Sequence, residues 1–319
     1  MNPVSPSSKS ALLLVRTPFQ AWLASQTLRA EGISNYSLVY FTHNDSSEDK
    51  YYFKELAANS LAAQYCYVPV RRFDILAHID MHWQIRSWRC SKSPDVILLA
   101  SINAPVINAL AAKHVTSELI TFDDGLANIL STEAYFIDKA SSRMRLYRRL
   151  LGATDLDAIK SRIVRHYTIY KGFNNIVDGL RLRYFDGWKS NQNTACYEGI
   201  MLSYFVGQPF EEDLTTKQIE SLEHFLRTMK IHFYVRHPRE RKTLNIEAPF
   251  MDKHGLLAED AILKHAQGQP VHLIGWYTSV LINLARSVNK ITMILLKSDA
   301  NSESMAATAR KAGCEIVLI

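Results

Sequence analysis

The chain has 319 residues, of which 47% are hydrophobic and 21% charged, and its formal net charge is +6. This length exceeds one typical domain of about 100–200 residues, and the apolar fraction is too high for a disordered or fibrous chain. The longest apolar run near the N-terminus is Ala11–Val15. It is shorter than the roughly 20 residues of a spanning helix or the ~7–15 of a signal peptide's apolar core, so we expect a cytoplasmic protein.

In the first half of the chain, short apolar runs alternate with helical stretches. The predicted strands are Ala11–Val15, Tyr36–Phe41, Gln64–Val70, Asp95–Ala100 and Glu118–Phe122. The predicted helices run to about Arg29 after the first strand, over Glu48–Ala63, through a Trp-rich stretch, and over Ala104–His114. Alternation of this kind predicts a parallel sheet built from right-handed βαβ units.

The second half shows the same alternation. Its predicted strands are Gly199–Val206, Lys230–Val235, Val271–Ile274, Ile291–Leu296 and Glu315–Ile319, and its predicted helices are Leu214–Met229, Leu257–Ala266, Thr278–Val288 and Ser302–Ala312. We therefore predict an α/β protein with two Rossmann-like domains, residues 1–190 and 191–319, whose parallel sheets face each other across a cleft. Ligands of such sheets bind beyond the carboxyl ends of the strands.

The positive charge is concentrated in the segment that joins the two halves. Between Lys139 and Lys189 there are twelve Lys/Arg and four Asp, which leaves a local charge of +8. Arg143, Arg145, Arg148 and Arg149 alternate there with apolar residues, a pattern typical of a basic amphipathic helix on an anionic membrane surface. A solvated helix that packs its leucines on the core explains the same pattern. No sequence motif for specific nucleic-acid binding accompanies the charge.

The four cysteines are far apart and form no C-x-x-C pair, a spacing that indicates reduced thiols rather than a disulfide scaffold or a zinc module: Cys66, Cys90, Cys196 and Cys314.

Four polar motifs follow predicted strands: Asp123-Asp124-Gly125, Gly207-Gln208-Pro209, His237-Pro238 and Thr278-Ser279. Each alone is a common turn or loop sequence. Together they supply a carboxylate that accepts a proton, an imidazole that assists a departing phosphate, and hydroxyls at a helix start that hold that phosphate. This combination predicts transfer from a phosphate-activated donor to a hydroxyl.

The order of these motifs resembles that of the bacterial sialyltransferases, which carry a D/E-D/E-G motif, then H-P, then a Ser/Thr pair. The sequences around the last two, Tyr234–Glu240 and Ser279–Ala285, are most similar to the lipooligosaccharide sialyltransferases of glycosyltransferase family 52 and their polysialyltransferase relatives. Thr17-Pro18-Phe19-Gln20 after the first strand also fits. The resemblance extends from about residue 11 to 290.

This resemblance implies a GT-B fold and a metal-independent, inverting transfer of sialic acid from CMP-sialic acid to a hydroxyl, expected on galactose in a bacterial surface glycan such as lipooligosaccharide or capsule. It makes Asp123 or Asp124 the base, with Asp123 favoured, and it assigns His237 to the CMP phosphate. Glu259 falls about where the family places a carboxylate on the cytidine ribose, although Asp260 is adjacent. The donor-binding set implied in this way is Thr17, Gln20, Gly207, Gln208, Pro238, Glu259, Thr278 and Ser279.

Several alternatives stay open at this point. The acidic stretch Glu211-Glu212-Asp213 offers another base, although acids are also favourable before a helix N-terminus. CMP-Kdo or a hexose nucleotide is the alternative to CMP-sialic acid as the donor, because a fold does not fix a substrate. A non-catalytic module that binds a nucleotide or an acidic glycan is the third possibility. We expect no cofactor and no metal. If the basic helix binds lipid, we expect the protein to attach to the inner face of the membrane. The oligomeric state stays open, and a homodimer is one option.

Overall fold

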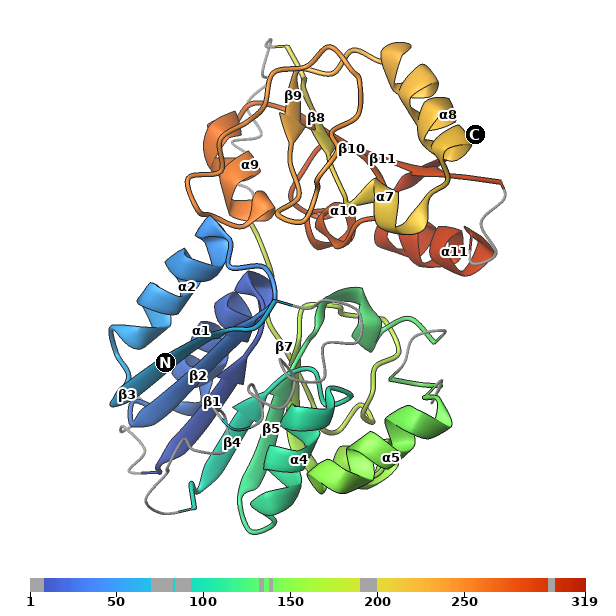
Figure 1. Cartoon of the computed structure of the whole chain (residues 1–319). Coiled ribbons are helices and arrows are strands. Elements are labelled where there is room, and N and C mark those ends of the chain that lie inside the picture. The colour runs from blue at the N-terminus through green and yellow to red at the C-terminus, as the bar shows by residue number, and fades with distance from the viewer. Residues whose placement is uncertain are drawn as a thin grey trace. The chain divides into compact units, whose positions relative to one another are not determined.

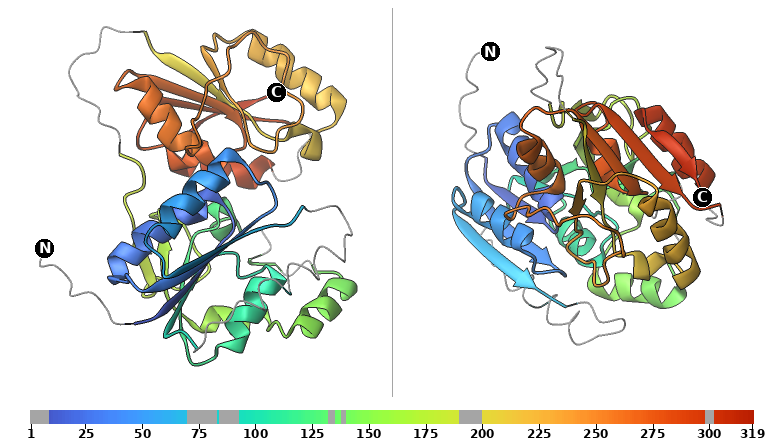
Figure 2. Two further views of the ribbon diagram at one scale, coloured as in Figure 1. Left: turned by 60° about the vertical axis from the view of Figure 1, so that its left-hand side comes forward. Right: turned by 90° about the horizontal axis from the view of Figure 1, so that it is seen from above.

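The computed structural model describes residues 9–69, 83, 93–131, 135–137, 140–189, 200–297 and 302–319. The chain separates into an N-terminal unit, Met1–Phe185, and a C-terminal unit, Asp186–Ile319. Each unit has its own sheet (Figures 1 and 2). Trp188 belongs to the C-terminal unit because its indole Nε1 donates to Asp260 and its carbonyl accepts a hydrogen bond from Ser287. The division therefore lies a few residues before position 190.

The described part of the N-terminal unit contains a seven-stranded sheet in the order β3-β2-β1-β4-β5-β6-β7, with every neighbouring pair parallel. Its strands are β1 (Ala11–Val15), β2 (Tyr36–Thr42), β3 (Ala62–Tyr67), β4 (Val96–Leu99), β5 (Glu118–Phe122), β6 (Ile163–Thr168) and β7 (Leu182–Tyr184). The predicted strands up to Phe122 are confirmed, with shifts of a few residues at their ends.

Helices cover both faces of this sheet (Figure 1). α1 (Pro18–Glu31) and α2 (Ser47–Ala57) pack on one face, whereas α4 (Pro105–Lys113) lies on the other and contacts α5 (Ser142–Leu151) and α6 (Leu156–Ser161). A 3-10 turn, η1 (Gly125–Asn128), follows β5. Leu12 and Leu14 of β1 are buried in one hydrophobic cluster with Ile107 of α4. Because both faces of the central strands are covered, β1 is apolar along its whole length.

Two features of the N-terminal unit differ from the prediction. α2 ends at Ala57 instead of Ala63, because the residues from Ala62 onward pair with β2 as β3. The basic segment contributes strands β6 and β7 to the sheet instead of merely joining two halves. Apart from Trp83, the Trp-rich stretch lies outside the described residues, as do Lys139, Cys90 and Cys196. Of the described cysteines, Cys66 and Cys314 are buried and belong to no disulfide.

The C-terminal unit contains, in its described part, a five-stranded parallel sheet in the order β12-β11-β10-β8-β9. Its strands are β8 (Leu202–Val206), β9 (Phe233–Val235), β10 (Val271–Trp276), β11 (Lys290–Leu295) and β12 (Glu315–Leu318). Its helices are α7 (Phe210–Asp213), α8 (Thr216–Arg227), α9 (Ala258–Ala266), α10 (Ser279–Asn283) and α11 (Ser302–Ala312). The predicted alternation is confirmed. The acidic stretch itself forms α7, and α10 is shorter than predicted.

Both sheets contain a point at which the strand order reverses. In the N-terminal unit this point lies between β1 and β4, and in the C-terminal unit it lies between β8 and β10. At such a switch point the loops beyond the strands leave in opposite directions and open a crevice. The loops after β1, β8 and β10 carry Thr17-Pro18-Phe19-Gln20, Gly207-Gln208-Pro209 and Thr278-Ser279, and the other two motifs follow the adjacent strands β5 and β9.

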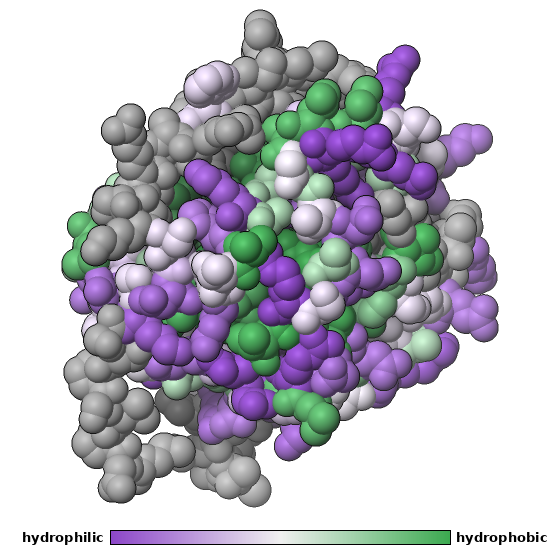
Figure 3. Space-filling view, turned by 90° about the horizontal axis from the view of Figure 1, so that it is seen from below, coloured by the Kyte–Doolittle hydropathy of each residue, from purple (hydrophilic) through white to green (hydrophobic). Residues whose placement is uncertain are grey.

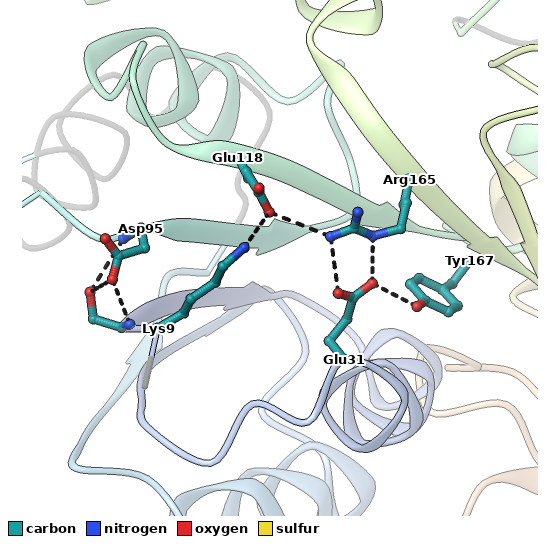
Figure 4. Close-up of polar contacts among 7 residues, drawn as sticks. Lys9, Glu31, Asp95, Glu118, Arg165 and Tyr167 are labelled. Carbon is teal, nitrogen blue, oxygen red and sulfur yellow. Dashed lines mark hydrogen bonds and ion pairs between the residues drawn. The ribbon is translucent and has the colours of Figure 1, made fainter. Parts of the chain in front are cut away.

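A polar network on the N-terminal sheet explains why a strand with a central arginine is stable (Figure 4). Arg165 of β6 donates from Nε and Nη2 to the two carboxylate oxygens of Glu31 at the end of α1, at 2.7 and 3.0 Å. Tyr167, two residues further along β6, donates to Glu31 at 2.7 Å. Glu118 of β5 accepts from Arg165 and from Lys9. The network fixes the end of α1 to β5 and β6.

We predict that Glu31→Gln lowers the free energy of unfolding by about 1–2 kcal/mol, because a bidentate and partly buried Arg–carboxylate pair is stronger than an exposed one. Lys189→Gln breaks the exposed Asp186–Lys189 pair and is expected to change the free energy by less than about 0.5 kcal/mol. Urea unfolding of both variants measures the difference. Equal effects would show that the Arg165 network adds no more than a surface ion pair.

Candidate active site

The Asp123-Asp124-Gly125 motif forms a tight turn after β5. Gly125 has a φ of 66°, in the left-handed region where a side chain is unfavourable. The Asp123 backbone still extends the sheet, since its N–H donates to the carbonyl of Tyr167 on β6 at 3.1 Å. The turn sends the two neighbouring carboxylates into different surroundings.

Asp123 is fully buried, with no solvent-exposed surface. Its Oδ1 lies 3.0 Å from Nε2 of His166, and its Oδ2 accepts from the backbone N–H of Ile169 at 3.0 Å. His166 is equally buried, and its Nδ1 lies 2.7 Å from the hydroxyl of Thr121. Both oxygens of Asp123 are thus held inside the unit.

Asp124 is partly exposed and follows β5, next to the switch point between β1 and β4. Its Oδ1 accepts from Nε2 of Gln20 at 2.5 Å, and its Oδ2 accepts from the hydroxyls of Ser101 at 2.7 Å and Tyr135 at 2.9 Å. Ser101 follows β4 and has a φ of 49°, a strained conformation that is often found at functional sites. Residues from the ends of β1, β4 and β5 therefore meet on one carboxylate.

Tyr135 is a hydrogen-bond donor in this cluster. Burial and the neighbouring Asp124 carboxylate raise the pKa of Tyr135 well above its ordinary value. The phenol therefore stays protonated and donates to Asp124.

Gln20 and Thr17 build the start of α1. The Thr17 hydroxyl accepts from the backbone N–H of Gln20 at 3.2 Å and caps the helix. Gln20 is fully buried; its Oε1 accepts from the Arg16 backbone, and its Nε2 donates to Ser101 as well as to Asp124. The amide of Gln20 is thus occupied in holding Asp124.

In the C-terminal unit, His237 and the exposed Pro238 follow β9. Nδ1 of His237 accepts from the backbone N–H of Arg239 at 3.1 Å. In a neutral ring one nitrogen accepts and the other carries the proton, so Nε2 of His237 is the donor. Glu240, whose side chain is buried, accepts from the His237 backbone N–H at 3.1 Å.

Gly207 and Gln208 follow β8, the neighbour of β10. Nε2 of Gln208 donates to the carbonyls of Trp276 and Tyr277. These carbonyls directly precede Thr278, which stands at the N-cap position of α10 without a side-chain capping bond, and Ser279, the first residue of α10. The bonds of Gln208 thus join the loop after β8 to the predicted phosphate loop after β10.

Glu259 lies at the start of α9 with 3% of its surface exposed. Its Oε1 accepts from Nδ2 of Asn283 on α10 at 2.7 Å. Burial raises the pKa of Glu259 above its ordinary value. The adjacent Asp260 accepts from the Trp188 indole at 2.7 Å.

The acidic stretch on α7 has different partners at each position. Oε1 of Glu211 accepts from the Arg241 backbone at 3.0 Å, and Glu212 pairs with Arg239 at 3.1 Å. Asp213 is exposed. These contacts place the acids beside the segment that carries His237.

The structure therefore brings the predicted site residues together in two groups. Asp123, Asp124, Thr17 and Gln20 lie at one edge of the N-terminal sheet, and the other candidates lie at strand ends or helix starts of the C-terminal unit. Over the described residues, no group of three His, Cys, Asp or Glu side chains could hold a metal ion, and no helix is long and apolar enough to cross a membrane.

Four side chains of these clusters were not predicted from the sequence: Ser101, Tyr135, His166 and Glu240. Ser101 directly follows a strand end, which is a usable signal. Glu240 stands three residues after His237 within the quoted motif. Tyr135 and His166 carry no local signal, because their partners are 11 and 43 residues away in the sequence.

The family model of glycosyltransferase family 52 matches residues 35–300. A CMP-N-acetylneuraminate:beta-galactoside alpha-2,3-sialyltransferase of Pasteurella multocida is 27% identical over 93% of this chain and 94% of its own length. An N-acetyllactosaminide alpha-2,3-sialyltransferase of Neisseria meningitidis is 23% identical over 81% of this chain and 70% of its own.

The glycosyltransferase SnogD from Streptomyces nogalater resembles the fold, with a TM-score of 0.51 and 13% identity over 98% of this chain and 88% of SnogD. This chain consists of two α/β units, each with a parallel sheet, and its likeness to SnogD confirms the GT-B fold that the resemblance implies. Since the family model covers most of its length, this chain belongs to glycosyltransferase family 52.

Proposed function

We propose that this enzyme transfers sialic acid from CMP-sialic acid to a galactose hydroxyl of a bacterial surface glycan, with inversion at the sugar carbon. The observation that carries the proposal is the nearly full-length similarity to the Pasteurella sialyltransferase, together with the position of all three motifs at strand ends. In this reaction the acceptor oxygen attacks C2 of the sialic acid, and the bond from C2 to the phosphate oxygen breaks. The acceptor proton passes to a base, and CMP leaves.

Asp124 is our proposed base. A general base has to touch the acceptor hydroxyl, and Asp124 is partly exposed whereas Asp123 has no exposed surface. Gln20, Ser101 and Tyr135 orient its carboxylate through neutral donors. In this proposal Asp123, bound to His166, positions the turn and does not meet the substrate.

His237, Thr278 and Ser279 are proposed to act on the leaving phosphate. The donor nitrogen Nε2 of His237 supplies a hydrogen bond or a proton to a phosphate oxygen as the bond to carbon breaks. Thr278 and Ser279 contribute hydroxyls at the start of α10. The carboxylate on Glu211 or Asp213 remains the alternative base, because α7 lies beside the segment that carries His237.

The test of the function is CMP release from CMP-sialic acid in the presence of a panel of galactosides, with CMP-Kdo and hexose nucleotides as parallel donors. We expect release from CMP-sialic acid that depends on a galactoside and continues in EDTA. Turnover of CMP-Kdo or a hexose nucleotide in place of CMP-sialic acid would show that the proposed donor is wrong and that the protein is still a glycosyltransferase. Tight binding of CMP without turnover of any donor would favour a non-catalytic module.

The choice of base is tested by a series of nearly isosteric amides. We predict that Asp124→Asn lowers kcat by at least about 10²-fold, since the amide keeps the shape but cannot take a proton. Asp123→Asn is expected to lower the melting temperature, because the amide disrupts the buried pair with His166. Its kcat is expected to stay closer to the wild-type value than that of Asp124→Asn. Steady-state kinetics and thermal melts of Asp123→Asn, Asp124→Asn and Asp213→Asn separate the candidates. An inactive Asp213→Asn beside an active Asp124→Asn would move the base to α7.

The role of Glu259 is tested by pH. Burial raises the folded-state pKa of Glu259 above its unfolded value, so the contribution of Glu259 to stability is greatest below the unfolded pKa and is lost as pH rises toward the folded pKa. Glu259→Gln stays neutral, so we predict that the wild type loses stability relative to this variant as pH rises above the ordinary pKa of a glutamate, 4.5. Urea unfolding across this range measures the trend. We expect the KM for the donor to change less than about 3-fold; a large rise would support a direct contact with the ribose.

We propose further that α5 docks on an anionic membrane surface. None of its residues is buried, and Met144, Leu146 and Leu150 are exposed beside Arg143 and Arg145. The leucine at 150 is 77% exposed, which argues against packing on the core as the purpose of this side chain. On the face seen from below, hydrophobic residues stand between hydrophilic ones (Figure 3). Exposed apolar side chains flanked by arginines suit a lipid headgroup region.

The membrane proposal predicts that changing Arg143, Arg145, Arg148 and Arg149 to Gln releases the enzyme from anionic vesicles, since each cation contributes about 1 kcal/mol near such a surface. Activity on a lipid-linked acceptor is expected to fall, while activity on a short soluble galactoside stays within about 2-fold. Co-sedimentation with phosphatidylglycerol vesicles is the measurement. The control is a fourfold change to Gln at exposed lysines elsewhere: Lys54, Lys217, Lys230 and Lys264. Equal release of both variants from the vesicles would show that binding depends on the net charge of the protein and not on α5.

A further inference from the structure

We propose that Glu240 is a positioning residue of this enzyme: its buried carboxylate joins the loop after β8 to the loop after β9 and fixes the direction in which His237 faces. The inference rests on the function proposed for His237. Glu240 contacts neither the donor nor the acceptor in this proposal, and it acts only through His237.

The first support is the set of hydrogen bonds around the Glu240 side chain, which has only 4% of its surface exposed. Oε2 accepts from the His237 backbone N–H at 3.1 Å, and Oε1 accepts from the hydroxyl of Tyr234 on β9. The backbone N–H of Glu240 in turn donates to the carbonyl of His237 at 3.1 Å. The carboxylate therefore closes the His237 turn on itself and anchors it to the strand.

The second support is the close approach of Gly207 at the end of β8. A Cβ atom at this position would overlap Oε2 of Glu240 and would lie 2.8 Å from Cε1 of Tyr234. Gly207 is therefore the residue that lets the β8 loop lie directly against the carboxylate. The next residue, Gln208, binds the two carbonyls before Thr278. The three strand-end loops of the unit are thereby linked in series.

The third support is the energetic cost of this arrangement. Burial raises the pKa of Glu240, and the Glu211 carboxylate adds to the effect. An apolar residue of similar size at this position would avoid that cost. An apolar residue could not accept a hydrogen bond from the His237 N–H. The buried carboxylate does accept this bond, and the bond holds the geometry of the turn.

The experiment compares Glu240→Gln and Glu240→Ala in the wild-type and His237→Ala backgrounds. In Glu240→Gln the side-chain oxygen still accepts from the His237 N–H and the amide donates to the Tyr234 hydroxyl, so we expect kcat within about 3-fold. Glu240→Ala is expected to lower kcat by about 10–100-fold, with the KM for the donor changed less than 3-fold. In the His237→Ala background the same change is expected to cost less than 3-fold, because the group being positioned is already missing.

The controls address folding. Glu247→Ala removes an exposed glutamate from the same segment and is expected to leave kcat and the melting temperature unchanged. Gly207→Ala displaces the Glu240 carboxylate without removing it and is expected to reproduce the loss in kcat, so it tests the inference if Glu240→Ala does not fold. Equal losses from Glu240→Ala in both backgrounds, or wild-type kcat in Gly207→Ala, would overturn the inference.

Failure of the proposed function gives a different result from failure of this inference. If the wild type releases no CMP from CMP-sialic acid, the donor assignment is wrong. The Hε1 resonance of His237, identified by its loss in His237→Ala, then provides the measurement. It is expected to shift in Glu240→Ala and to stay in place in Glu247→Ala. An unshifted resonance in folded Glu240→Ala would refute the positioning role.

Discussion

A buried carboxylate has to be surrounded by hydrogen-bond donors, and in both units this requirement holds the strand-end loops in place. Asp123 is bound by the imidazole of His166 and the Ile169 backbone, whereas Glu240 is bound by Tyr234 and the His237 backbone. In each case the donors come from the same turn or from a neighbouring strand. If one of these loops moved independently, it would leave a buried carboxylate without its hydrogen-bond donors.

The parallel arrangement of the strands makes these contacts available. All strands of a parallel sheet end at the same edge, so loops that are distant in sequence meet there. Gln20 and Asp124 are 104 residues apart and share a hydrogen bond because β1, β4 and β5 are neighbours. Gln208 reaches the carbonyls before Thr278 for the same reason, since β8 pairs with β10. The site geometry is thus a consequence of strand order.

The part of this arrangement that sequence alone predicts is the part that depends on local pattern. β1 is uniformly apolar and β5 has a short apolar run, and the sequence predicts both at their observed bounds, Ala11–Val15 and Glu118–Phe122. β6 was missed because Arg165 and His166 interrupt its apolar pattern, and both are accommodated by distant partners, Glu31 and Asp123. The motif positions at strand ends were predictable for the same local reason. The different burial of Asp123 and Asp124 was not, because it depends on which neighbouring strands supply donors.

The basic segment shows how tertiary structure redistributes a charge that looks uniform in the sequence. Arg162 donates to the carbonyls of Ala111 and His114, and Arg181 donates to those of Lys160 and Ile163. Together with Arg165, these cations serve as hydrogen-bond donors within the N-terminal unit. Arg143 and Arg149 of α5 are exposed, and their helix buries none of its residues. The local charge of +8 therefore overstates the charge that this segment presents at the surface.

The same short segments that terminate strands and start helices also build the candidate site. The Thr17 hydroxyl caps α1 by binding the N–H of Gln20, and this turn delivers the Gln20 amide to Asp124. In the C-terminal unit, the turn that ends β9 at His237 is closed by Glu240, which also contacts the β8 loop at Gly207. Substitutions in these turns change local stability and site geometry together. A drop in activity at Gln20 or Glu240 therefore identifies positioning only when the change in stability is measured on the same variant, since one hydrogen bond contributes to both.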